Sequence, residues 1–77
     1  MEIKTKLGLR IKAIREIAGM SQKDLAYSAD LDRSYIASVE SGKRNVSIVN
    51  IEKIATALGV SVKEFFNDVS FDEKKEL

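Results

Sequence analysis

Apolar residues recur with helical spacing along most of the chain, and the runs are separated by single glycines or short polar turns. In the first run Leu7, Ile11, Ile14 and Ala18 fall on one face of a helix, because they are three or four residues apart. Alternation of the kind that marks a strand nowhere persists. The pattern predicts five short helices, at about Lys4–Ala18, after Ser21, over Arg33–Glu40, after Ser47 and after Ser61.

Residues that favour helix ends stand at the boundaries of these runs. Asp24 and Glu64 each follow a serine by three residues, which is the spacing of a capping box. The segment Val69–Phe71 fits neither a helix nor a loop clearly, and its structure stays open. The expected capping residues are Ser21, Asp32, Ser47 and Ser61, and the expected stop residues are Gly19, Gly42 and Gly59.

The second and third predicted helices, joined by a short polar turn, have the features of a helix-turn-helix. Ala26 allows close packing between them, and Ile36 and Val39 give the third helix an apolar face to bury. Its other face is then available to the major groove of DNA, where Arg33 is suited to two hydrogen bonds with guanine. This outer face consists of Asp32, Arg33, Ser34, Tyr35, Ala37 and Ser38.

Composition narrows the classes of function. The chain has no cysteine and no histidine, which removes thiol nucleophiles, zinc ribbons and the commonest general base. With 44% hydrophobic and 32% charged residues, its 77 residues fit one small folded domain and no membrane span. We expect a cytoplasmic protein that is not an enzyme and has no catalytic residues, metal or cofactor.

The net charge of +1 conceals an uneven distribution along the chain. Residues 1–20 carry five basic and two acidic side chains, whereas residues 45–77 carry four basic and six acidic ones. A basic N-terminal segment is compatible with a polyanionic partner. It is equally compatible with ordinary solvated helix faces, and we assign Arg10 and Lys12 to such a surface.

Several separated segments resemble a known family. The runs at 19–26 (GMSQKDLA) and 34–42 (SYIASVESG) resemble the phage repressor/Cro-type helix-turn-helix regulators. Within that family, LDRSYI at 31–36 and RNVSI at 44–48 are most similar to the controller proteins of restriction–modification systems. The resemblance covers about residues 7–66 and implies an all-α, compact five-helix domain like that of the lambda repressor. We place this domain at residues 1–68 and an acidic tail at 69–77.

The resemblance also implies roles for single residues. Gln22 would contact phosphate and brace the recognition helix, while Tyr35 would lie on sugar or phosphate beside the residues that face base edges. Free N–H groups at the start of the second helix are independently suited to phosphate. Arg15 and Glu40 match an internal ion pair. The expected DNA-binding residues are Ser21, Gln22, Asp32, Arg33, Ser34, Tyr35, Ser38, Lys43, Arg44 and Asn45.

Structural alternatives exist for several of these roles. Arg33 would pair with Asp30 or Asp32 if it were only a surface arginine, and Tyr35 would pack against the edge of the core. The cations of the loop at 43–44 follow a helix end, where positive charge is favourable without DNA. Two departures from the family pattern affect turns, because Asp30 stands where glycine is usual and Val46 where proline is common.

An aromatic cluster near the C-terminus predicts an interface. One short helix cannot bury both Phe65 and Phe66, so a monomer would expose an apolar patch unless the tail covers it. A symmetric dimer would place two recognition helices about 34 Å apart on a palindrome. The expected interface residues are Val62, Phe65, Phe66 and Val69.

These observations together predict a transcriptional regulator that binds a palindromic operator in double-stranded DNA as a homodimer. By resemblance it would control a restriction–modification operon as activator and repressor, with RNA polymerase as a candidate further partner. The alternative is an antitoxin or adaptor that binds a protein through the same fold.

Overall fold

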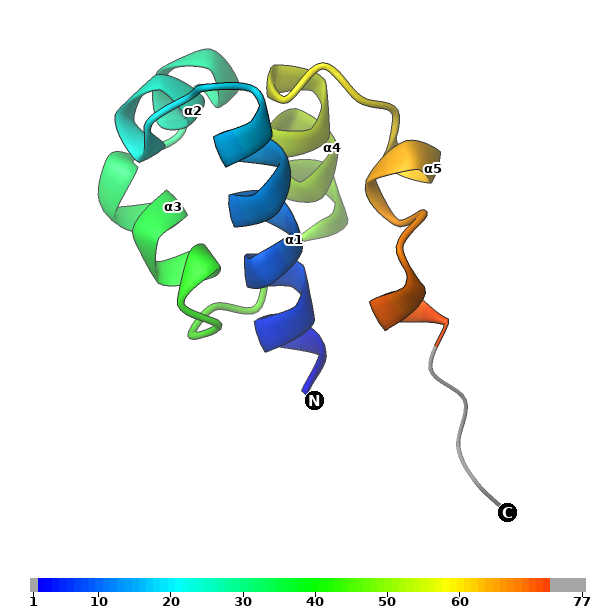
Figure 1. Ribbon diagram of the computed structural model, residues 1–77. Helices are drawn as coiled ribbons and strands as arrows, with labels where there is room; N and C mark the ends of the chain where they lie inside the picture. Colours follow the sequence, from blue (N-terminus) through cyan, green and yellow to red (C-terminus); the bar gives the residue numbers. More distant parts are fainter. Residues whose placement is uncertain (1, 73–77) are drawn as a thin grey trace.

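The computed structural model describes residues 2–72, so most of the predicted acidic tail, residues 73–77, lies outside the described residues. Within that range the all-α prediction is confirmed, and the helices are the five expected (Figure 1). The open segment after the fifth helix forms a single 3₁₀ turn. The elements are α1 (Ile3–Ile17), α2 (Gln22–Ala29), α3 (Arg33–Glu40), α4 (Ile48–Ala57), α5 (Val62–Phe65) and η1 (Val69–Phe71).

The helix starts follow the predicted caps closely. The Ser21 hydroxyl accepts a hydrogen bond from the Asp24 N–H at 3.0 Å, and the Asp24 carboxylate accepts one from the Ser21 N–H at 2.9 Å. Ser61 and Glu64 form the same reciprocal pair at the start of α5, and the Ser47 hydroxyl caps α4. Each cap satisfies backbone groups that the first helical turn leaves without a partner.

The turn between α2 and α3 has one expected feature and one that the sequence did not predict. Asp30 adopts the left-handed conformation, with φ 56° and ψ 48°, as expected for the position where the family has glycine. Asp32 is the N-cap residue of α3, as expected, and has the extended backbone of that position, but its side chain makes no capping hydrogen bond.

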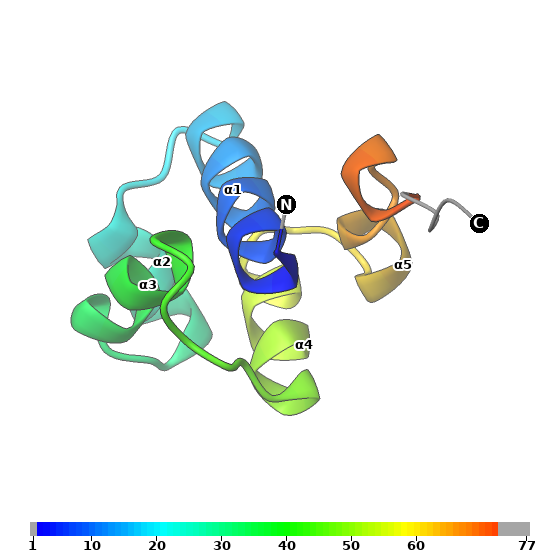
Figure 2. The same cartoon turned by 90° about the horizontal axis from the view of Figure 1, so that it is seen from below.

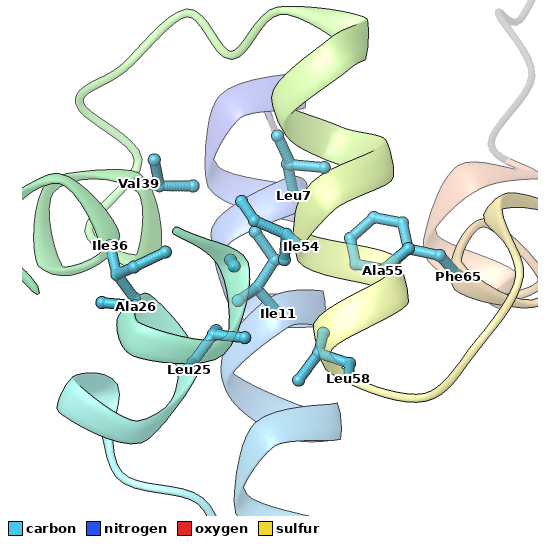
Figure 3. Close-up of a cluster of buried hydrophobic side chains, with 11 residues drawn as sticks. Leu7, Ile11, Leu25, Ala26, Ile36, Val39, Ile54, Ala55, Leu58 and Phe65 are labelled. Carbon is cyan, nitrogen blue, oxygen red and sulfur yellow. The ribbon is translucent and has the colours of Figure 1, made fainter. Parts of the chain in front are cut away.

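One side chain from each helix meets in a single core (Figure 3). Ile11, Leu25, Ile36, Ile54 and Phe65 are each at most 1% exposed. Each contributes about 1.5–3 kcal/mol by leaving water, so the five helices stabilise one another. The other buried hydrophobic residues are Leu7, Ala26, Ala29, Val39, Ala55 and Leu58.

The helices surround this core in an order that separates two surfaces. α2 and α3 lie together on one side of α1, whereas α5 and η1 lie on the opposite side, next to α4 (Figures 1 and 2). α1 and α3 approach closely at Gly8, where a Cβ would lie only 2.5 Å from the carbonyl oxygen of Val39. The helix-turn-helix and the α5–η1 segment therefore lie on different sides of α1.

Candidate nucleic-acid interface

The recognition helix α3 has one buried and one open face, as the apolar pattern predicted. Ile36 and Val39 are 0% and 1% exposed and hold the helix against the core. Arg33 and Ser34, at its N-terminal end, are exposed, while Ser38 one turn later is half-buried. Small or flexible side chains on the open face allow the helix backbone to approach base edges in a major groove.

A buried polar cluster braces the C-terminal end of α3. The guanidinium group of Arg15 on α1 donates two hydrogen bonds to the Glu40 carboxylate, from Nε at 2.6 Å and from Nη2 at 3.0 Å. Its third nitrogen, Nη1, donates to the carbonyl oxygen of Met20 at 2.8 Å. Gln22, the first residue of α2, donates from Nε2 to the same Glu40 carboxylate at 3.1 Å. Three helices are thus joined at one carboxylate, and the expected Arg15–Glu40 ion pair is confirmed.

This cluster is a strong ion pair because it is shielded from water. The side chains of Arg15 and Glu40 are 10% and 4% exposed, so the charges attract each other in a low-dielectric setting. The hydrogen bonds from Arg15 to Glu40 raise the pKa of the Arg15 guanidinium above its ordinary value, so the group stays charged. Gln22 braces the recognition helix through Glu40 as expected, and its contact with phosphate stays a prediction.

A second polar cluster, which the sequence did not reveal, lies at the N-terminal end of α3. The Asn50 amide on α4 donates a hydrogen bond to the Tyr35 hydroxyl at 3.1 Å, and the Arg44 guanidinium lies 5.1 Å from the centre of the Tyr35 ring. Tyr35 is half-buried, so it packs at the core edge and also faces outward. With Ser34, these residues line an open hollow of about 360 Å³ beside the helix end.

The remaining expected DNA-binding residues lie on the surface of the same side. Lys43, Arg44 and Asn45 are exposed in the loop that follows α3. Arg33 makes no ion pair with Asp30 or Asp32 in the part of the chain that the structure describes, and its contact with base edges stays a prediction.

Ser21 has less capacity for phosphate than the sequence implied. Its backbone N–H already donates to the Asp24 carboxylate, which places a negative charge at the start of α2. The Ser21 hydroxyl oxygen accepts from the Asp24 N–H, so the hydroxyl is also engaged within the cap. The Asp24 carboxyl has a pKa below its ordinary value, chiefly because the Ser21 N–H and hydroxyl donate to it.

The expected dimerisation surface is smaller than the sequence indicated. Phe65 is 0% exposed inside its own chain, so its inclusion in an interface was wrong, because no surface remains for a second copy. Phe66 is half-buried, and the Phe71 ring from η1 packs edge-on against it with centroids 5.1 Å apart. Val62 is half-buried and Val69 is 81% exposed. An apolar surface of Val62, Phe66 and Val69 therefore remains, and its use as an interface stays a prediction.

Arg10, which we had assigned to solvated surface, instead joins α1 to α5. Its guanidinium group donates to the carbonyl oxygens of Phe65 at 2.7 Å and Glu64 at 2.9 Å. It also lies 3.6 Å from the Asp68 carboxylate. The sequence carried no signal for this contact, because the partners are main-chain atoms far along the chain.

Two other kinds of site are not supported by the residues that the structure describes. Among residues 2–72, no helix is long and apolar enough to cross a membrane. The same residues contain no cluster of acidic side chains that could hold a metal ion.

The comparisons with known proteins agree with this geometry. The helix-turn-helix family model HTH_3 matches residues 11–65. The control protein C.MunI of Mycoplasma sp is 46% identical over 69 residues, which cover 88% of this chain and 93% of that protein.

Two solved structures extend the similarity to three dimensions. The restriction–modification controller protein C.AhdI from Aeromonas hydrophila is 49% identical and has a TM-score of 0.79, covering 82% of this chain and 96% of that one. The C.Esp1396I controller tetramer, solved with its natural 35 base-pair operator, is 42% identical with a TM-score of 0.81 and covers 86% and 87% of the two chains. The chain therefore belongs to the helix-turn-helix family of restriction–modification controller proteins.

Proposed function

We propose that this chain is a sequence-specific DNA-binding regulator of transcription that acts as a homodimer on a palindromic operator. By its family, the operator belongs to a restriction–modification operon. Its relatives are regulators and not enzymes. We assign it to the cytoplasm, where operator DNA is bound, and RNA polymerase is a candidate further partner. The observation that carries this proposal is the recognition helix, braced at Glu40 and open at Arg33.

Affinity and sequence choice come from different parts of this surface. The exposed loop at 43–45 supplies two cations and an amide for the phosphate backbone, which is the main source of affinity. Arg44 is partly ordered before DNA arrives, since it lies over the Tyr35 ring. Arg33 supplies sequence choice, because its planar guanidinium group matches the two acceptors of guanine in the major groove.

Dimerisation makes the recognition of a full operator possible. α5 and η1, which carry Val62 and Val69, lie on the other side of α1 from the recognition helix α3 (Figure 2). Two copies joined there by a two-fold axis would present two recognition helices to successive major grooves. The crystallised C.Esp1396I tetramer on its operator supports an oligomeric mode of binding.

Selection of bound sequences from a random DNA pool, followed by a salt titration, tests the function. A regulator of this kind selects one palindrome and loses affinity with salt at a slope of about 0.9 per phosphate contacted. A protein-binding adaptor would select no sequence and show no such slope.

The role of Arg33 is tested on the selected operator. Arg33→Ala should weaken operator binding by about 1–3 kcal/mol and relax the preference at one base position in each half-site. Lys53→Ala is the matched control, because it removes the same charge from an exposed position on α4 that belongs to neither the proposed DNA-binding residues nor the proposed interface. Equal loss of affinity for operator and random DNA in Arg33→Ala would contradict base reading by this residue.

A further inference from the structure

The guanidinium group of Arg10 forms a clamp around the end of α5. Nε donates to the Phe65 carbonyl oxygen at 2.7 Å and Nη2 donates to the Glu64 carbonyl oxygen at 2.9 Å. The remaining nitrogen, Nη1, lies 3.6 Å from an oxygen of the Asp68 carboxylate. All three nitrogens of one side chain on α1 therefore contact a stretch of five residues at the other end of the chain.

This arrangement matches what the end of a short helix requires. α5 has only four residues, and the Glu64 carbonyl oxygen at its end already accepts from the Asn67 N–H at 3.1 Å, so Arg10 adds a second donor there and one at Phe65. A planar guanidinium group satisfies two adjacent carbonyl oxygens at once, and its positive charge complements the negative end of the helix. A lysine has no such fork of donors, so the contact depends on arginine itself.

Few other contacts hold the segment that follows α5. Phe65 is the only buried residue of α5, and η1 has none. Phe66 packs edge-on between the rings of Phe65 and Phe71, with centroids 5.0 Å and 5.1 Å away. Phe66 also packs against the core, and Ser70 donates to the Asp68 carboxylate from its N–H and its hydroxyl. The Arg10 clamp therefore acts together with these contacts in setting the direction in which the chain leaves Phe65.

We propose that Arg10 is a positioning residue for dimerisation, because its clamp on the end of α5 orients the Phe66 and Val69 side chains for a second copy. This inference rests on the proposed homodimer. Arg10 lies on the side of α1 that contacts α5, away from the recognition helix, so its effect on DNA passes through the dimer.

The effect on dimerisation is amplified by symmetry. If the loss of the clamp reduces the fraction of molecules with a correctly placed α5–η1 segment, the apparent affinity falls by that fraction. The α5–η1 segment must be correctly placed in both copies, so the apparent association constant of the dimer depends on the square of that fraction. A fall to about one third in each copy raises the apparent dimer Kd about tenfold.

The experiment compares Arg10→Gln and Arg10→Lys with Lys12→Gln. Lys12 is exposed and lies two residues further along α1, so its variant loses the same charge without touching α5. Sedimentation equilibrium of the whole chain, well below the Tm of each variant, gives the dimer Kd. Amide hydrogen exchange at Phe71 and Asp72, whose N–H groups bond within η1, reports the placement of the segment.

We expect Arg10→Gln to raise the dimer Kd about tenfold, Arg10→Lys to fall between it and the wild type, and Lys12→Gln to match the wild type. Exchange should accelerate at Phe71 and Asp72 and stay unchanged in α3. A purely structural arginine would lower the Tm and leave the Kd of the folded protein unchanged, which overturns the proposal. If Arg10→Gln does not fold, the dimer Kd of Arg10→Lys tests the proposal instead. A raised Kd supports it, and a wild-type Kd overturns it. A wild type that stays monomeric would overturn the proposed homodimer as well, whereas a wild-type dimer with unchanged variants overturns only the role of Arg10.

Discussion

Whether Gly8→Ala raises or lowers the free energy of unfolding depends on the tertiary structure. It lies within α1, where replacement by alanine would ordinarily stabilise a helix by about 1 kcal/mol. An alanine Cβ at this position would, however, lie 2.5 Å and 2.6 Å from the carbonyl oxygens of Val39 and Glu40, and 2.9 Å from the carbonyl carbon of Glu40. All three are backbone atoms of α3, so no side-chain rotation relieves the contact.

The steric cost should exceed the gain in helix propensity. Overpacking a tight contact costs typically about 1–3 kcal/mol, and three backbone contacts place Gly8→Ala at the upper end. Subtracting the propensity gain leaves a loss of about 2 kcal/mol in the free energy of unfolding. For a domain of this size that lowers the Tm by about 8–16 °C.

Thermal unfolding followed by circular dichroism, at a fixed protein concentration, measures this loss. Ala13→Gly is the matched control, because Ala13 is exposed on the same helix and its replacement reports propensity alone, at about 1 kcal/mol. Gly8→Ala should also weaken operator binding in its folded state, since α3 must move and Glu40 with it. A Tm equal to or above that of the wild type would refute the close approach of α1 and α3.

Three further predictions concern single side chains. Asp30→Gly should raise the free energy of unfolding, measured by urea titration, by about 0.5–1 kcal/mol. Asp30 is exposed and has φ 56°, a conformation that glycine adopts without strain. A lower urea midpoint in the variant would contradict this. Glu40→Gln should destabilise the protein by about 3 kcal/mol, because it leaves the buried Arg15 charge without its counterion. A loss of stability no larger than that of Glu52→Gln, at an exposed position on α4, would contradict this. The Asp24 carboxyl has a lowered pKa in the folded protein, so its contribution to stability is complete above the ordinary value of about 3.9 and is lost as the pH falls through the lowered value. Acid titration of stability should therefore be shallower for Asp24→Asn than for the wild type, and parallel curves would contradict this.

The helix boundaries are the part of the fold that the sequence predicts best. Ser21, Ser47 and Ser61 start helices where expected, because a capping bond involves groups only three residues apart. The packing of a helix-turn-helix was predictable for a related reason, since Ile36 and Val39 recur on one face of α3.

The candidate site was predictable in part. The Arg15–Glu40 pair and the exposed position of Arg33 followed from the family resemblance and from helix periodicity. The bond between Asn50 and Tyr35 did not, because an asparagine in the first turn of a helix is usually an ordinary surface residue.

Local sequence alone therefore determined where each helix begins and ends and which face of it is apolar. Only the tertiary structure decided which of two adjacent phenylalanines is buried, since Phe65 enters the core and Phe66 stays at its edge. It also decided that Arg10 holds the end of α5 instead of facing water. The physical reason is the same in both cases: capping and periodicity act within one or two helical turns, whereas these contacts join atoms that only the packing of α5 beside α4 and α1 brings together.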